Sequence, residues 1–186
     1  MKGKLVIVMV GLPARGKSTM ARKLGRTLEM DGVRVRIFNN GELRRKLDTD
    51  FSTSSSEFFS PANVQGKEMR ERISQLNIEQ AQAFLQEGGE VAVIDASNVT
   101  RERRRNIDAA FPALPMLYVE CVNADEEALE ANLERKAGLK EFRHLSREKA
   151  LESFVRRINY YESIYEPLDE ESNRILVDSF DSCILQ

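Results

Sequence analysis

The segment at residues 11–18 has the spacing G-x-x-x-x-G-K-S and directly follows an apolar, largely β-branched run at 5–10. A strand that leads into a glycine-rich loop and then a helix is the arrangement that cradles phosphate groups. Glycine at positions 11 and 16 lets successive backbone N–H groups converge on phosphate oxygens. The motif therefore predicts a nucleotide-binding site. A chance glycine turn between a strand and a helix is the structural alternative.

The residues of this loop have defined chemical tasks. We expect Lys17, in a solvent-facing loop, to supply a cation for the β- and γ-phosphates of a nucleoside triphosphate, and the Ser18 hydroxyl to reach Mg²⁺. The N-terminus of the following helix presents partial positive charge to the same anion. The expected nucleotide-binding residues are Gly11, Leu12, Pro13, Ala14, Arg15, Gly16, Lys17, Ser18 and Thr19.

Apolar runs alternate with helical patterns along the chain. Strands are expected at residues 5–10, 33–39, 91–95, 116–122 and 174–178, and helices near 16–30, 64–87, 100–111, 125–137 and 146–165. This alternation predicts an α/β fold with a mostly parallel, five-stranded sheet flanked by helices. It is the three-layer α/β/α arrangement of P-loop nucleoside triphosphate hydrolases, of the adenylate-kinase-like kind. We expect one domain over residues 1–186, with ligands at the carboxyl ends of the strands.

Composition and segment lengths argue against two classes of partner. With 28 Lys and Arg against 30 Asp and Glu, the formal charge is −2, so no overall basic field attracts nucleic acid. No apolar stretch is long enough to cross a bilayer. Cys121 and Cys183 are expected to be free thiols in a cytoplasmic, reducing setting. The segments 48–63 and 138–145 break the alternation and are expected to be loops that can close over a site.

Asp95 ends the buried run at 91–95 and is a candidate for the chemistry. An acid at the carboxyl end of such a strand is placed to hold Mg²⁺ or to orient an attacking hydroxyl. Capping of the next helix is the alternative role, which Asn98 and Thr100 could supply equally well. The basic run at 101–105 is expected to be mainly a solvated helix face, with only some side chains directed at a site.

Arginines follow the second strand and lie on the last helix. Arg44 and Arg45 come shortly after a strand end, and Arg157 and Tyr161 lie one turn apart on an otherwise apolar helix face. An arginine in apolar surroundings needs an anionic partner, because an unpaired buried charge is costly. The partner is either a protein carboxylate, which gives a structural ion pair, or a substrate phosphate held by two hydrogen bonds.

Over nearly its whole length the chain resembles the kinase domain of the 6-phosphofructo-2-kinase/fructose-2,6-bisphosphatase family. The likeness includes G-L-P-A-R-G-K at 11–17, the glycine at 41 with R-R at 44–45, E-F-F at 57–59, D-A-S-N at 95–98 and T-R-E-R-R at 100–104. It continues with R-R-I at 156–158 and Y-E at 161–162. The resemblance implies phosphoryl transfer from Mg-ATP to the 2-hydroxyl of fructose 6-phosphate, which yields fructose 2,6-bisphosphate.

The resemblance also implies roles for individual residues. Lys17, Asp95 and Lys136 match catalytic positions, Ser18 and Asp95 match Mg²⁺ ligands, and Asn132 matches a nucleotide-binding asparagine. The spacing from Asn132 to Lys136 is one residue shorter than in the family. Positions that bind fructose 6-phosphate in the family are occupied here by Arg44, Arg70, Ser97, Arg103, Lys136, Arg157 and Tyr161.

The chain departs from the family pattern at two points. Asn123 stands where the family has a cysteine linked to activity. The bifunctional members of the family continue into a phosphatase domain with a phosphohistidine, whereas this sequence ends at Gln186 and its lone His144 is expected to be solvated. We therefore expect kinase activity without phosphatase activity.

The expected ligands are ATP, Mg²⁺ and a sugar phosphate, and no membrane is expected as a partner. Nucleic acid is disfavoured as a partner, and a homodimer is left open. A polynucleotide 5′-hydroxyl kinase, or another small-substrate P-loop kinase, is one rival. Such kinases usually carry an acidic residue shortly after the second strand, where this chain has Asn40 and Gly41. A nucleotide-binding regulator without catalysis is a rival from another class, and the intact set of Lys17, Ser18 and Asp95 disfavours it.

Overall fold

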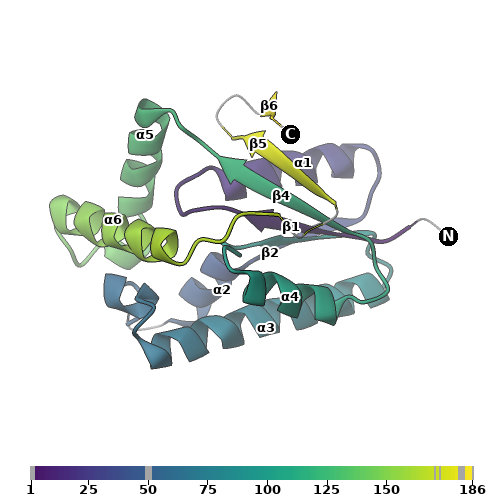
Figure 1. Cartoon of the computed structure of the whole chain (residues 1–186), viewed down its shortest axis with the longest axis horizontal. Helices are drawn as coiled ribbons and strands as arrows, with labels where there is room; N and C mark the ends of the chain where they lie inside the picture. Colours follow the sequence, from purple (N-terminus) through teal and green to yellow (C-terminus); the bar gives the residue numbers. More distant parts are fainter. Residues whose placement is uncertain (1–2, 49–51, 170, 172, 180–182, 186) are drawn as a thin grey trace.

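The computed structural model describes residues 3–48, 52–169, 171, 173–179 and 183–185. Its strands form one sheet in the order β2-β3-β1-β4-β5-β6 (Figure 1). Their bounds are β1 (Leu5–Val10), β2 (Val35–Asn39), β3 (Val91–Asp95), β4 (Met116–Val122), β5 (Arg174–Asp178) and β6 (Cys183–Ile184). The first five strands pair in parallel and match the expected ones, except that β2 begins two residues later than the expected 33–39.

The sheet has six strands rather than the expected five. The additional strand, β6, pairs antiparallel with β5 at the edge of the sheet and contains only two residues. A strand of this length has no room for the alternating pattern that reveals longer strands. The mostly parallel α/β architecture is confirmed.

Helices account for most of the remaining described chain. They are α1 (Lys17–Met30), α2 (Asn40–Leu47), α3 (Val64–Gln86), α4 (Arg101–Ala110), α5 (Glu126–Ala137) and α6 (Arg147–Ser163), with short 3₁₀ helices η1 (Ser56–Phe59) and η2 (Lys140–Phe142). The helix α2 was not predicted from the sequence, because its one buried residue is Arg44 and it has no apolar stripe. Both 3₁₀ helices fall in segments expected to be loops. No described helix is long and apolar enough to span a membrane.

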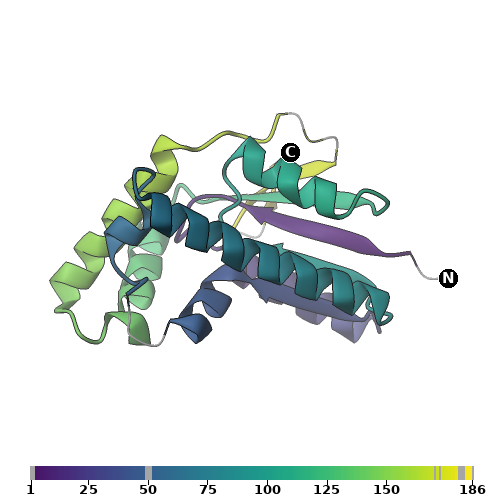
Figure 2. The ribbon, with the colours of Figure 1, turned by 90° about the horizontal axis from the view of Figure 1, so that it is seen from below.

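Helices cover both faces of the sheet, as the two ribbon views show (Figures 1 and 2). In β1, Val6 and Val8 face a core shared with α3 and α4, while Ile7 and Met9 face a core shared with α1. All four side chains are at most 2% exposed. Burial on both faces explains why the parallel strands read as continuous apolar runs.

A third, smaller core joins α5 and α6 beyond the carboxyl ends of the strands (Figure 2). Phe142, Ala150 and Phe154 pack there with Ala14 of the glycine-rich loop. The α5–α6 unit is therefore attached directly to the loop expected to hold phosphate. This contact places the unit at the edge of the sheet where ligands of parallel α/β folds bind.

Candidate active site

The glycine-rich loop has the backbone that its sequence predicts. Gly11 and Gly16 have φ angles of 136° and 77°, in the region that favours glycine. A Cβ at Gly11 would lie 2.5 Å from the Cys121 carbonyl oxygen, and one at Gly16 would lie 2.6 Å from Ser179 Oγ. Conformation and space therefore both require glycine. Ala14 is also left-handed, with φ 64°, which the sequence did not reveal.

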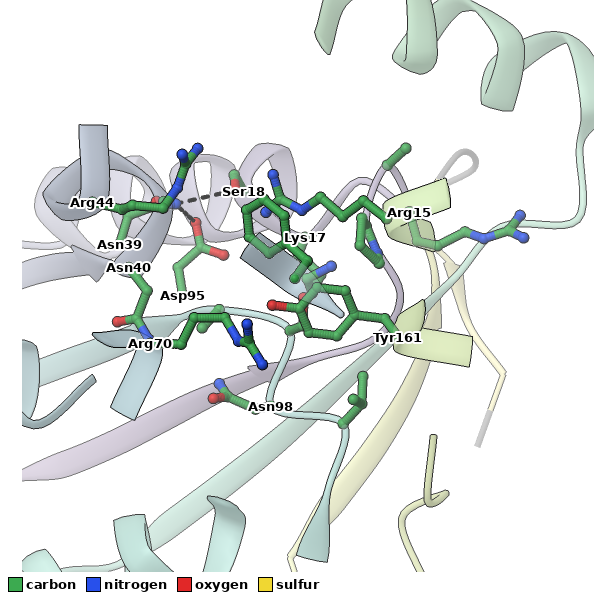
Figure 3. A pocket seen from close by; sticks show the side chains of 18 of the residues that line it. Arg15, Lys17, Ser18, Asn39, Asn40, Arg44, Arg70, Asp95, Asn98 and Tyr161 are labelled. Carbon is green, nitrogen blue, oxygen red and sulfur yellow. Dashed lines mark hydrogen bonds between the residues drawn. The ribbon is translucent and has the colours of Figure 1, made fainter. Parts of the chain in front are cut away.

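Lys17 is not solvent-facing, contrary to expectation. Its side chain points inward (Figure 3), and the residue is 8% exposed. Lys17 Nζ donates a 2.5 Å hydrogen bond to the Leu12 carbonyl oxygen. Burial lowers the pKa of Lys17 to about 8, although the nearby Asp95 opposes the shift. The amine is therefore charged at neutral pH and lies close to the pH at which it loses its proton.

Ser18 and Asp95 are brought together by a residue that the sequence analysis did not select. Asn39 Nδ2 donates to Ser18 Oγ at 3.2 Å and also to Asp95 Oδ2 (Figure 3). Asn39 and Asp95 are paired positions at the carboxyl ends of β2 and β3. Ser18 Oγ and Asp95 Oδ2 thus accept hydrogen bonds from the same amide group. Both are oxygen ligands of the type that Mg²⁺ prefers, so the pair fits this ion. The position of a polar residue at the end of the second strand is the signal in the sequence that could have identified Asn39.

The alternative role of Asp95 as a helix cap is excluded. Thr100 is the N-cap of α4, and its hydroxyl accepts a hydrogen bond from Arg103 N at 3.3 Å. Asn98 has a different structural task, because its Nδ2 donates to the Met9 carbonyl oxygen at 2.8 Å. Asp95 is 3% exposed at the end of β3 and faces the phosphate loop.

Arg157 does not form the structural ion pair considered above. Its guanidinium lies 3.7 Å from the ring centroid of Phe59 and 5.3 Å from that of Phe154, and it has no ion-pair partner among the described residues. Burial lowers the pKa of Arg157 to about 10, so the side chain still carries its charge at pH 7. The pKa of Lys136 is lowered to about 8, mainly by burial and to a smaller extent by the positive charge of Arg157. Neither cation forms an ion pair with a carboxylate among the described residues, although Glu141 and Asp95 act on them from farther away.

Other arginines expected at the substrate are already bonded within the protein. Arg44 is 3% exposed, donates to the Thr53 carbonyl oxygen at 2.7 Å and pairs with Glu141 of η2. Arg103 pairs with Glu71 of α3. Arg70 donates to the Phe58 carbonyl oxygen and lies over the Phe58 ring, and burial lowers its pKa.

The basic run of α4 departs further from expectation at Arg104. This residue is 1% exposed rather than solvated. It pairs with Glu171 and donates to the carbonyl oxygens of Glu166 and Pro167 at 3.0 and 3.2 Å. Arg104 therefore fastens α4 to the segment that leads into β5.

One cavity of about 580 Å³ unites most of the expected site. Its lining includes Pro13, Ala14, Arg15, Gly16, Lys17, Ser18, Thr19, Arg44, Arg70, Asp95, Ser97, Arg103, Lys136, Arg157 and Tyr161. Gly11, Leu12 and Asn132 are not part of this lining. Asn132 Nδ2 donates to the Ala14 carbonyl oxygen at 3.0 Å, so it holds the phosphate loop in place.

Asn123 also supports the phosphate loop. Its carbonyl oxygen accepts a hydrogen bond from Arg15, and its Oδ1 accepts one from Asp125 N at 2.8 Å. The residue is 5% exposed. At this position the asparagine orders the connection between β4 and α5.

The fold and the phosphate loop define a P-loop kinase. The family model of 6-phosphofructo-2-kinase matches residues 1–181, and the chain belongs to this family. It is 41% identical over 175 residues to 6-phosphofructo-2-kinase/fructose-2,6-bisphosphatase 4 of Rattus norvegicus, a match that covers 92% of the chain. It is 34% identical over 177 residues to 6-phosphofructo-2-kinase 1 of Saccharomyces cerevisiae, with 91% of the chain covered.

These relatives are much longer proteins. The matches cover 37% of the rat protein and 21% of the yeast protein. Among solved structures, the APS kinase CysC of Mycobacterium tuberculosis has a TM-score of 0.56 at 18% identity, with 94% of this chain and 88% of that one covered. A gluconokinase from Sinorhizobium meliloti has a TM-score of 0.51 at 16% identity, with coverage of 96% and 83%. At these identities the likeness shows the fold alone.

Proposed function

We propose that the chain is a single-domain, ATP- and Mg²⁺-dependent kinase that transfers the γ-phosphoryl group to the 2-hydroxyl of fructose 6-phosphate. The observation that carries this proposal is a single cavity lined both by the phosphate loop with Asp95 and by Arg157 and Lys136, two cations without an ion-pair partner among the described residues. These two sets of lining residues suit an acceptor that offers both a hydroxyl and a phosphate. Family membership supports fructose 6-phosphate as that acceptor.

Phosphoryl transfer asks the protein mainly for positioning and for neutralisation of charge. In the proposed mechanism Lys17 releases the Leu12 carbonyl and contacts the phosphate oxygens between nucleotide and acceptor. Ser18 and Asp95 would hold Mg²⁺, which when bound supplies positive charge to the β- and γ-phosphates. Asp95 is also proposed to accept a hydrogen bond from the attacking hydroxyl. Lys136 then balances the charge that develops during transfer.

At the other end of the site, Arg157 is proposed to hold the acceptor phosphate. Its guanidinium is stacked on Phe59 and therefore keeps its hydrogen-bonding edge for a ligand. Arg70 and Tyr161 line the same part of the cavity and are proposed to complete this subsite, with Ser97 and Arg103. Arg44 is proposed to act mainly by shaping the wall, because Thr53 and Glu141 already occupy both terminal nitrogens of its guanidinium.

The test is ATP consumption by the purified chain with each of a panel of phosphosugars, with and without Mg²⁺. We expect ADP release that depends on fructose 6-phosphate and Mg²⁺. The product should release phosphate on brief acid treatment, since a phosphate on the anomeric carbon is acid-labile and a 1-phosphate ester is not. An acid-stable bisphosphate would contradict transfer to the 2-hydroxyl. Labelling of oligonucleotide 5′ ends alone would favour the polynucleotide kinase, and nucleotide binding without any turnover would favour the regulator.

A cytoplasmic location is part of the proposal. Cys121 and Cys183 are both free thiols, as expected for a reducing compartment.

A further inference from the structure

Asn40 is a pocket residue to which neither the sequence motifs nor the proposed mechanism gives a task. It is the first residue of α2, directly after Asn39, which pairs with Asp95 across the sheet. Its side chain lines the cavity, on the wall that also carries Asp95 and Arg70 (Figure 3). A ligand that extends from Asp95 toward the arginines therefore passes Asn40.

The orientation of the Asn40 amide is fixed from behind by Asn77. Asn77 lies on the buried face of α3, is 3% exposed, and donates from Nδ2 to Asn40 Oδ1 at 2.7 Å. This hydrogen bond occupies the oxygen of Asn40. The two N–H groups of Asn40 have no hydrogen-bond partner in the described part of the chain, so the residue offers the cavity a donor.

The apolar surroundings of Asn77 argue against a role in core packing alone. Its neighbours on α3, Ile73 and Ile78, are apolar core residues that are both 3% exposed. An amide in such surroundings costs stability unless it is hydrogen-bonded, and an apolar side chain would avoid that cost. The asparagine thus gives the site a fixed donor at Asn40, at the expense of an apolar contact in the core.

We propose that Asn40 is a specificity-determining residue that donates a hydrogen bond from Nδ2 to an oxygen of the acceptor sugar, and that Asn77 is its positioning residue. The inference rests on the proposed function and identifies a group that contacts the sugar itself. The contacted oxygen is a hydroxyl or ring oxygen between the attacking hydroxyl and the phosphate. The nucleotide contacts the phosphate loop instead, so Asn40 distinguishes acceptors and leaves ATP binding unaffected.

The near-isosteric variant Asn40→Leu tests the donor. We expect the KM for fructose 6-phosphate to rise about threefold to tenfold, the range for loss of one neutral hydrogen bond. The KM for ATP should stay within about twofold of wild type, a split that general loosening of the site would not give. Asn40→Asp retains an oxygen for Asn77 but removes the donor, and we expect it to impair acceptor binding at least as much.

Asn77→Ala tests the positioning residue. We expect it to raise the acceptor KM by a smaller factor than Asn40→Leu, and to add nothing in the Asn40→Leu background, because Asn77 acts through Asn40. Gln82→Ala is the matched control, since Gln82 lies on the same helix and donates to the Ala110 carbonyl oxygen at 2.7 Å. It should leave the acceptor KM unchanged.

Three results would overturn the inference: an unchanged acceptor KM in Asn40→Leu, a full additive effect of Asn77→Ala in the double variant, or an equal effect of Gln82→Ala. Wild-type turnover of sugar phosphates is measured first. Its absence would refute the proposed function, and the inference with it. Normal wild-type turnover with insensitive variants would refute the inference alone.

Discussion

At the scale of single residues, the arginines of the site differ in whether the protein already satisfies their charge. Arg44 and Arg103 are paired with Glu141 and Glu71, whereas Arg157 lies on aromatic rings without an ion-pair partner among the described residues. All of them line the same cavity. Lining the cavity therefore does not distinguish these arginines. Whether the protein already pairs their charged groups does.

Arg157→Ala is expected to raise the KM for the sugar phosphate at least about tenfold, because a charged, bidentate contact contributes roughly 1.5–3 kcal/mol. The KM for ATP should change little. Arg156→Ala is the matched control, since the adjacent arginine is 54% exposed and pairs with Glu152. Steady-state kinetics with each substrate varied in turn measures both constants. Equal weakening toward both ligands would contradict an acceptor-phosphate role for Arg157.

Lys17→Met is expected to lower turnover by about 10²–10³, as loss of one preorganised charge stabiliser typically does. Its effect on folding should be small or favourable. The fall in the Lys17 pKa from 10.5 to about 8 corresponds to a cost on the order of 3 kcal/mol for the buried charge. Methionine removes this cost and loses one charged hydrogen bond, of roughly 1.5–3 kcal/mol. Urea unfolding at pH 7 without ligand provides the check, and a strongly destabilised variant would show that Lys17 is needed for the fold.

The sequence predicted which residues lie at the cavity better than it predicted their surroundings. Lys17, Ser18 and Asp95 could be placed because their spacing from a strand end fixes where they lie. That Lys17 is buried, that Arg44 faces Glu141, and that Asn39 joins Ser18 to Asp95 depend on contacts between distant segments. A single sequence carries no direct signal for contacts between distant segments.

At the scale of elements, buried ion pairs hold α2 against the segment between α5 and α6. Glu141 of η2 is 3% exposed, and its carboxylate forms an ion pair with Arg44. Its Oε1 also lies 3.5 Å from Arg45 Nη1. The long strands and helices were predictable because periodicity marks them. Besides the two 3₁₀ helices, the missed elements were a short polar helix and a two-residue strand, both of which depend on partners brought by the fold.

Glu141→Ala should therefore destabilise the protein strongly, by about 3–5 kcal/mol, because it leaves Arg44 buried without its carboxylate. Glu134→Ala provides the comparison, since it breaks a pair with Arg147, whose side chain is 75% exposed. An exposed pair of this kind contributes less than about 1 kcal/mol. Denaturant unfolding of both variants measures the difference. Similar losses in the two would mean that the buried pair does not fasten α2 to η2.

At the scale of the whole molecule, the cavity gathers cations from helices that cover different parts of the sheet. Lys17 begins α1, Lys136 ends α5 and Arg157 lies in α6. Burial, and to a smaller extent repulsion from neighbouring cations, lowers the pKa values of both lysines to about 8. The arrangement proposed to bind polyphosphate therefore makes the free site sensitive to moderately alkaline pH.

Activity and stability should consequently respond to alkaline pH in opposite directions. Because the lysines act as cations, kcat/KM, which reports the free enzyme, should fall as pH rises through about 8. Folding should respond the other way, since the folded lysine loses its proton near pH 8 and the unfolded one near 10.5, so the unfolded chain binds more protons between these values. The free energy of unfolding should thus rise from pH 8 toward 9. Above pH 9 this gain is opposed by Cys121, whose pKa is raised from 9.0 to about 11 by burial. Parallel pH series of kcat/KM and of urea unfolding separate the two effects, and a joint decline of both between pH 8 and 9 would show that unfolding, rather than loss of the lysine charges, limits activity.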